Sequence, residues 1–227
     1  MKDIEFLKSN LIAHRGIYDN KRVYENTLKA FKIAMDRNYI IEADVRMLVD
    51  GTVVVFHDQD MERLLHLEGD IEKLSYEELT YIAKYSIPTL EEMLEFIDGK
   101  VPLIIELKSR KKRGIFENRV AEILDKYEGL YAIQTFHIKT IKWFNKNRDN
   151  VIVGYLVNKR NLNKMHFFKK YDFININMEV VNDKKLKFLR ANYLVLGYTI
   201  RSKDELNNKQ NYYDNLICDN LLEIDAS

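Results

Sequence analysis

Short apolar runs rich in β-branched residues alternate, along the whole chain, with longer charged segments of helical period. Buried strands that alternate with helices predict a mostly parallel sheet with right-handed crossovers. No linker rich in Pro, Gly or Ser divides the 227 residues, and this length suits one large domain. We therefore expect a single α/β domain spanning 1–227, a TIM (β/α)8 barrel. The expected strands are Leu11–His14, Ile40–Val45, Val53–His57, Leu103–Leu107, Tyr131–Phe136, Val151–Val157, Phe173–Asn177, Tyr193–Thr199 and Leu216–Asp219.

The segments between these runs carry helical signals. Thr27–Arg37 repeats its apolar residues at helical spacing and keeps its lysines on the other face. Two stretches, Ser75–Glu78 and Thr89–Glu92, fit the capping box that starts a helix. Further helices are expected at Glu117–Tyr127, His137–Arg148, Asn182–Asn192 and Lys203–Asn211.

Nine strands are one too many for an eight-stranded barrel, and a turn explains the excess. Asp50-Gly51 separates the second run from the third, and Asp-Gly between strands is a strong hairpin signal. A parallel crossover needs a dozen or more residues, so Val53–His57 is expected to return antiparallel to the second strand. A two-residue loop at this turn places Asp44 opposite His57.

Charge and cysteine content exclude several classes of protein. The chain has 36 Lys and Arg against 35 Asp and Glu, so it has no overall field that would hold nucleic acid or an acidic membrane. Its one cysteine, Cys218, allows neither an internal disulfide nor a Cys-rich zinc site. No apolar run reaches the roughly 18–20 residues of a membrane helix, and no secretory signal is recognised at the N-terminus. We expect a cytoplasmic protein without stable membrane insertion.

Three carboxylates stand at or near the ends of two expected strands. Glu42 and Asp44 are two residues apart, so both face the same side of their strand. Glu106 lies near the end of the next parallel strand. Oxygen ligands without a thiol suit a hard cation such as Mg²⁺ or Ca²⁺. Polar residues at the carboxyl ends of barrel strands are typical of an active site.

Two histidines and two fixed positive charges stand at, or directly after, the ends of expected strands. His14 and His57 are suited to acid and base roles near neutral pH, and Arg15 and Lys108 are suited to a phosphate. A strand-end histidine alone is more often a structural residue. The combination over three segments is what predicts phosphoryl chemistry.

A set of motifs spans the first half of the chain: His14-Arg15-Gly16, Glu25-Asn26-Thr27, Glu42-x-Asp44, Asp50-Gly51, Val54–Asp58, Ile87–Glu92 and Ile105–Lys108. In these motifs the chain resembles the glycerophosphodiester phosphodiesterases over roughly residues 11–108, with weaker similarity toward the C-terminus. The resemblance implies a TIM barrel and hydrolysis of glycerophosphodiesters to glycerol 3-phosphate and an alcohol. It implies that His14 and His57 are the acid/base pair, that Arg15 and Lys108 contact phosphate, and that Ca²⁺ or Mg²⁺ binds to the carboxylates Glu42, Asp44 and Glu106. Three departures concern the barrel rim and the alcohol pocket: Tyr24 for Pro, Tyr198 for Trp, and Asn220-Leu221 where a Pro usually follows the Asp near the C-terminus.

The sequence also allows other interpretations of the function. A small insertion at about 59–87 contains apolar residues that suit either the core of a lid or contact with lipid, so a lysophospholipase D-like activity on the same scaffold is the alternative. A basic run, Arg110–Arg113, is expected at the rim of the site. A ligand-binding barrel without catalysis is the reading from a different class, and the complete set of seven site residues argues against it.

Overall fold

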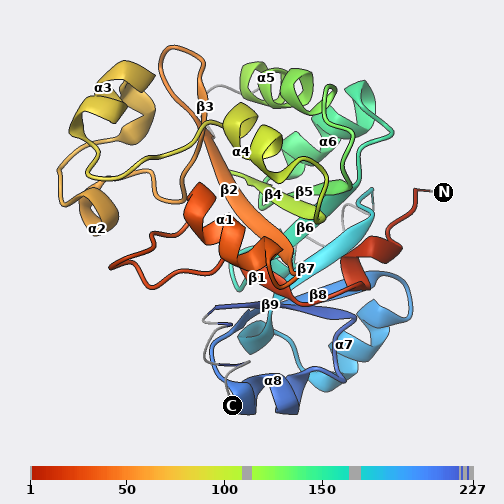
Figure 1. Cartoon of the computed structure of the whole chain (residues 1–227). Helices are drawn as coiled ribbons and strands as arrows, with labels where there is room; N and C mark the ends of the chain where they lie inside the picture. Colours follow the sequence, from red (N-terminus) through yellow and green to blue (C-terminus); the bar gives the residue numbers. More distant parts are fainter. Residues whose placement is uncertain (1, 109–113, 164–169, 220, 222–223, 225–227) are drawn as a thin grey trace.

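The computed structural model describes residues 2–108, 114–163, 170–219, 221 and 224. Eight parallel strands form a closed ring, because β1 pairs with both β2 and β9 (Figure 1). This confirms the eight-stranded barrel with one extra strand. The strands are β1 (Ile12–His14), β2 (Ile40–Met47), β3 (Val53–Val55), β4 (Leu103–Leu107), β5 (Tyr131–Thr135), β6 (Val153–Val157), β7 (Phe173–Asn177), β8 (Leu194–Ile200) and β9 (Asn215–Cys218).

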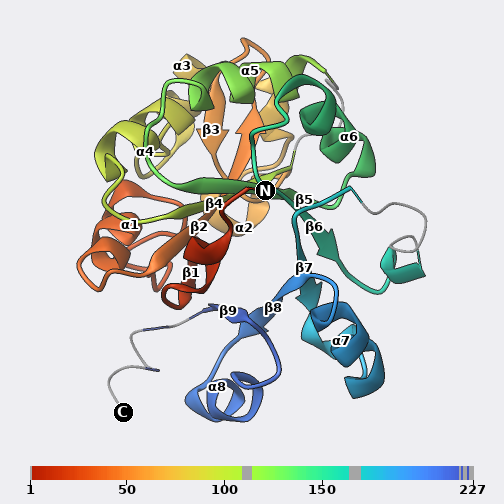
Figure 2. The same cartoon turned by 90° about the vertical axis from the view of Figure 1, so that its right-hand side faces the viewer.

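Helices surround the strands, as the turned view shows (Figure 2). Each expected helix is present: α1 (Leu28–Met35), α3 (Tyr76–Ile82), α4 (Leu90–Ile97), α5 (Ile115–Leu124), α6 (Ile138–Asn147), α7 (Asp183–Arg190) and α8 (Lys203–Lys209). Both expected capping boxes form at the starts of α3 and α4. Short elements without a clear sequence signal are α2 (Glu62–Leu65) and the 3-10 turns η1 (Glu5–Lys8), η2 (Ile71–Lys73) and η4 (Met178–Val180).

The antiparallel return of β3 along β2 is confirmed, but the expected register is wrong by one residue. Val45 pairs with Val55, and the Phe56 N–H donates to the Asp44 carbonyl at 2.9 Å. Asp44 is therefore opposite Phe56, not His57. The loop has three residues because the Leu48 N–H donates to the Thr52 carbonyl at 2.9 Å. Gly51, at φ +88°, supplies the left-handed residue that such a three-residue loop needs.

The barrel interior changes from apolar to polar along the strands. Its amino-terminal half is filled by a buried cluster that includes Ile40, Ile104 and Phe173. Two residues further along the same strands, and therefore on the same side, come Glu42, Glu106 and Asn175. The carboxyl ends of the strands thus carry the polar groups, as in barrel enzymes.

The segment 59–87 lies beside β3 (Figure 1) and packs around a hydrophobic cluster that it shares with Leu48, Val54 and Phe56 of the β2–β3 hairpin. Met61, Leu64, Leu65 and Ile71 are all buried there, so these apolar residues serve as core. The basic run Arg110–Arg113 lies outside the described residues. Among the described residues, the structure contains no helix that is both long and apolar enough to cross a membrane.

Candidate active site

The first motif forms a tight turn after β1. Arg15 and Gly16, which follow His14, both have positive φ, at +58° and +79°. A Cβ at Gly16 would lie 2.8 Å from the carbonyl carbon of Ala30, so the turn accepts only glycine there. The turn directs the guanidinium of Arg15 toward the barrel, where its Nε lies 3.1 Å from Oδ2 of Asp44.

Each residue of the Glu25-Asn26-Thr27 motif has a distinct contact. Glu25 Oε1 accepts a hydrogen bond from Arg15 Nη1 at 2.7 Å. Asn26 donates through Nδ2 to Asp44 Oδ2 at 3.0 Å and accepts the Asp44 backbone N–H through Oδ1 at 3.2 Å. Thr27 caps α1 by accepting the Ala30 N–H. The motif therefore fixes one guanidinium and one carboxylate, and it starts the helix that follows.

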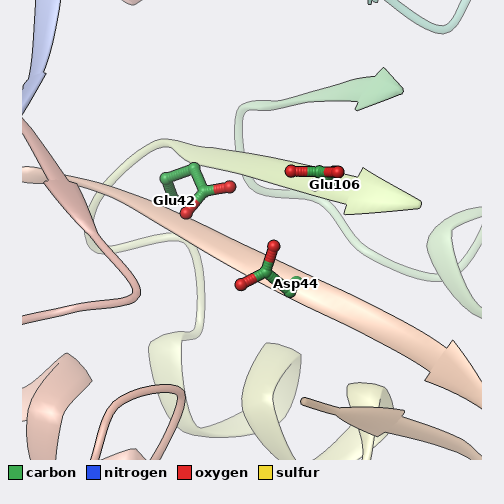
Figure 3. Close-up of side chains that lie close together, drawn as sticks. All are labelled: Glu42, Asp44 and Glu106. Atoms are coloured by element: carbon green, nitrogen blue, oxygen red, sulfur yellow. The ribbon is translucent and has the colours of Figure 1, made fainter. Parts of the chain in front are cut away.

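The three predicted carboxylates converge. Glu42 and Asp44 on β2 and Glu106 on β4 each offer an oxygen within 4.8 Å of the others (Figure 3). Burial raises the pKa of Glu42 well above its ordinary value and that of Glu106 to about 7. Buried carboxylates this close together repel one another when ionised, and a divalent cation would offset that repulsion. All-oxygen donors of this kind fit a hard cation.

Positive side chains flank the carboxylates. Lys108 Nζ lies 2.8 Å from Glu106 Oε1 and 3.2 Å from Asp44 Oδ1. Burial alone raises the pKa of Asp44, but the charges of Lys108 and other nearby bases outweigh it and hold that pKa well below its ordinary value. Burial lowers the pKa of Arg15, but Asp44, Glu25 and Glu42 outweigh it, so the guanidinium stays charged.

Both predicted histidines are held by carboxylates that the sequence reasoning did not assign. His14 Nδ1 lies 2.6 Å from Asp219 Oδ1, and His57 Nδ1 lies 2.6 Å from Asp58 Oδ1. A carboxylate at Nδ1 favours a proton on that nitrogen and leaves Nε2 as the reactive atom. His14 Nε2 is 3.9 Å from Glu42 Oε2. Asp58 directly follows His57 in the sequence, which was the available signal for it, whereas Asp219 follows the last strand and reaches His14 only because β1 pairs with β9.

Gln134 and Asn175 are further polar residues of the site that sequence reasoning missed. Gln134 Nε2 donates to Glu42 Oε1 at 3.0 Å, and Asn175 Nδ2 donates to Gln134 Oε1 at 2.8 Å. Both side chains are buried. Their signal was a polar residue at an inward position of a strand. The chain of two amides orients Glu42.

Six of the seven predicted site residues line one cavity of about 210 Å³ at the carboxyl ends of the strands. The seventh, Asp44, is fully buried and joined to Arg15 and Lys108. A larger hollow of about 650 Å³ lies between α4 and the residues before β5, at the other end of the strands. It is lined by neither histidine nor arginine. The residues lining the first cavity are His14, Arg15, Glu42, His57, Glu106, Lys108, Gln134, Phe136, Leu156, Asn175, Tyr198, Thr199, Arg201 and Ile217.

Known proteins are similar to this chain in sequence or in fold. A glycerophosphodiester phosphodiesterase of Caldanaerobacter subterraneus is 34% identical over 165 residues, which cover 66% of this chain and 67% of that protein. A lysophospholipase D of Mus musculus is 28% identical over 135 residues, covering 52% of this chain and 39% of that protein.

A solved structure of an Oleispira antarctica phosphodiesterase in complex with the product sn-glycerol-3-phosphate aligns with a TM-score of 0.83 at 22% identity. It covers 96% of this chain and 95% of its own. At that identity the likeness shows the fold. The model of the glycerophosphoryl diester phosphodiesterase family matches residues 14–221. The chain therefore belongs to the glycerophosphoryl diester phosphodiesterase family of hydrolases.

Proposed function

We propose that this enzyme hydrolyses glycerophosphodiesters to glycerol 3-phosphate and an alcohol, with His14 and His57 as the acid/base pair. One observation carries the proposal. Two histidines, each held at Nδ1 by a carboxylate 2.6 Å away, share one cavity with a cluster of carboxylates. This arrangement supplies a proton donor, a proton acceptor and a place for a cation around a single substrate.

We propose Mg²⁺ or Ca²⁺ as the cofactor, held by Glu42, Asp44 and Glu106. The buried all-oxygen donor set and the raised pKa values of Glu42 and Glu106 support this choice. When bound, such a cation withdraws charge from a phosphate oxygen. Gln134, through its hydrogen bond to Glu42, keeps one ligand oriented.

We assign His57 the role of base in the first step. Burial lowers the pKa of His57, although the charge of Asp44 and the hydrogen bond to Asp58 act in the opposite direction. At neutral pH its imidazole is therefore uncharged and accepts a proton at Nε2. The nucleophile whose proton it takes is water, or the neighbouring hydroxyl of the glycerol, in which case a cyclic phosphate forms that water then opens to glycerol 3-phosphate. His14, oriented by Asp219, then protonates the departing alcohol.

Arg15 and Lys108 are the proposed phosphate contacts. Both side chains are 13% exposed and line the cavity. Their positive charges offset the charge that grows on phosphate oxygens as the bond to the alcohol breaks. Arg15 is fixed for this role by Glu25 and Asp44.

Small glycerophosphodiesters suit the site better than lysophospholipids. The cavity holds about 210 Å³, and the apolar side chains Met61, Leu64, Leu65 and Ile71 are buried in their own cluster rather than exposed to receive an acyl chain. The likeness to the mouse lysophospholipase D covers only half of this chain.

Glycerophosphocholine and lysophosphatidylcholine, assayed in parallel with Mg²⁺ or Ca²⁺, test the proposal. We expect release of glycerol 3-phosphate and choline from the first substrate, at a kcat/KM well above that for choline release from the second. The reverse preference would move the function to lysophospholipids. His14→Ala and His57→Ala enzymes distinguish the assigned site from a contaminating activity, because each should lose about 10²–10⁴ in rate.

A further inference from the structure

Arg63 lies on α2, inside the segment 59–87, and binds two carboxylates of the barrel. Its Nη1 and Nη2 donate to Glu25 Oε2 and Oε1, both at 2.7 Å. Its Nε donates to Asp58 Oδ2 at 2.6 Å. All three nitrogens of the guanidinium are thus in use, and a lysine offers no such planar fork.

Each of these carboxylates also holds a proposed active-site residue. Asp58 Oδ1 lies 2.6 Å from His57 Nδ1, and Glu25 Oε1 accepts from Arg15 Nη1 at 2.7 Å. Through these two carboxylates Arg63 therefore links His57 to Arg15, both of which line the cavity. Burial raises the pKa of Asp58, but hydrogen bonds from His57 and Arg63 outweigh it and keep the carboxylate ionised.

Other residues of the same segment also contact the barrel. The ring of Tyr85 stacks on that of Tyr24, next to Glu25, with 4.0 Å between centroids and 4° between planes. Arg46 of β2 donates through Nε to the His57 carbonyl at 2.9 Å and through Nη1 to Glu72 at 2.8 Å. The segment is therefore held against the barrel near His57, and these contacts fix the position of Arg63.

We propose that Arg63 is a positioning residue that orients His57 through Asp58 and Arg15 through Glu25, so that segment 59–87 braces the active site. The inference rests on the roles proposed above for His57 and Arg15. In this role the segment orients the active-site residues and acts as a support for the site, whereas a lid would cover the substrate.

The contacts predict which kinetic constant changes. Among the described residues, the side-chain partners of Asp58 are His57 and Arg63. Glu25, in contrast, also accepts from Asn20 Nδ2 at 2.9 Å, so it keeps a second support when Arg63 is removed. Loss of Arg63 therefore disturbs the histidine more than the phosphate contact, and kcat falls more than KM rises.

Steady-state kinetics of Arg63→Ala and Arg63→Lys with glycerophosphocholine test this role. Arg119→Ala is the matched control, because Arg119 is 44% exposed against 43% for Arg63 and makes a 2.8 Å ion pair with Glu91 on the outer helices. We expect kcat to fall about 10- to 100-fold in both Arg63 variants, with KM changed less than about threefold and Arg119→Ala unchanged. Guanidinium ion, below denaturing concentration, should restore part of kcat in Arg63→Ala alone, and urea should not.

Wild-type kcat in both Arg63 variants, a loss confined to KM, or recovery with urea as large as with guanidinium would overturn the inference. If Arg63→Ala does not fold by circular dichroism, Arg63→Lys carries the test. A wild-type enzyme without activity on glycerophosphocholine would instead refute the proposed function. In that event ¹⁵N NMR of the His57 ring still tests the inference, because Arg63 variants should lose the single Nδ1–H tautomer; an unchanged spectrum would refute it.

Discussion

Asp219→Asn tests whether the carboxylate behind His14 contributes to catalysis. Asp219 Oδ1 lies 2.6 Å from His14 Nδ1. Burial raises the pKa of Asp219, but the hydrogen bond and charge of His14 outweigh it, so the pKa is lowered and the group is ionised. A hydrogen bond to a charged acceptor contributes about 1.5–3 kcal/mol and one to a neutral acceptor about 0.5–1.5 kcal/mol. Replacing the carboxylate with an amide should therefore raise the activation free energy by about 1–1.5 kcal/mol, which is roughly a 5- to 15-fold loss in kcat/KM.

The assay is glycerol 3-phosphate release from glycerophosphocholine, measured with saturating cation across the pH range. Asp125→Asn is the control, because Asp125 is a half-exposed carboxylate at the C-cap of α5 that pairs with Arg148 at 2.9 Å. We expect the control to match the wild type. An Asp219→Asn enzyme with wild-type kcat/KM would refute the reasoning, and so would an equal loss in the control.

Three other substitutions give distinct readouts. Glu106→Gln removes a proposed cation ligand and should weaken Mg²⁺ or Ca²⁺ binding at least about tenfold by calorimetry; unchanged affinity would remove Glu106 from the ligand set. The Glu25 pKa is lowered from 4.5 to about 2 by Arg63, Asn20 and Arg15, against burial. A lowered carboxylate pKa stabilises the fold above its unfolded value and loses that stabilisation as pH falls toward the folded value. The destabilisation by Glu25→Gln in urea should therefore be largest near neutral pH and shrink between pH 4.5 and 2; a constant difference would contradict it. Gly16→Ala should cost about 1–3 kcal/mol of unfolding free energy, since φ is +79° and the new Cβ meets Ala30 at 2.8 Å; a wild-type urea midpoint would contradict it.

The strands and helices were predictable because period and length separate them well. Runs such as Leu103–Leu107 are too short for a typical helix and so favour a buried strand, and capping boxes such as that of Thr89 marked helix starts. The hairpin register was not predictable at the level of one residue. Asp50-Gly51 fits both a two- and a three-residue loop, and the backbone hydrogen bond between Leu48 and Thr52 decides between them.

The site was predictable where polar groups interrupt apolar strands, which is how Glu42, Asp44 and Glu106 were found. Groups that act through another side chain carry no such pattern. Asp219 follows the last strand, and only the closing of the barrel between β1 and β9 brings it to His14. Arg63 lies in a segment whose packing against the barrel depends on a hydrophobic cluster that includes residues distant in sequence, such as Leu48 and Val54.

The most direct test of the account is the cation dependence of glycerol 3-phosphate release. Enzyme stripped with EDTA is assayed with glycerophosphocholine, and Mg²⁺ or Ca²⁺ is then added back in excess over the chelator. We predict no release above the enzyme-free rate in EDTA and full recovery on addition of the cation. The same rate with and without EDTA, or no release under either condition, would contradict a cation-dependent phosphodiesterase built on Glu42, Asp44 and Glu106.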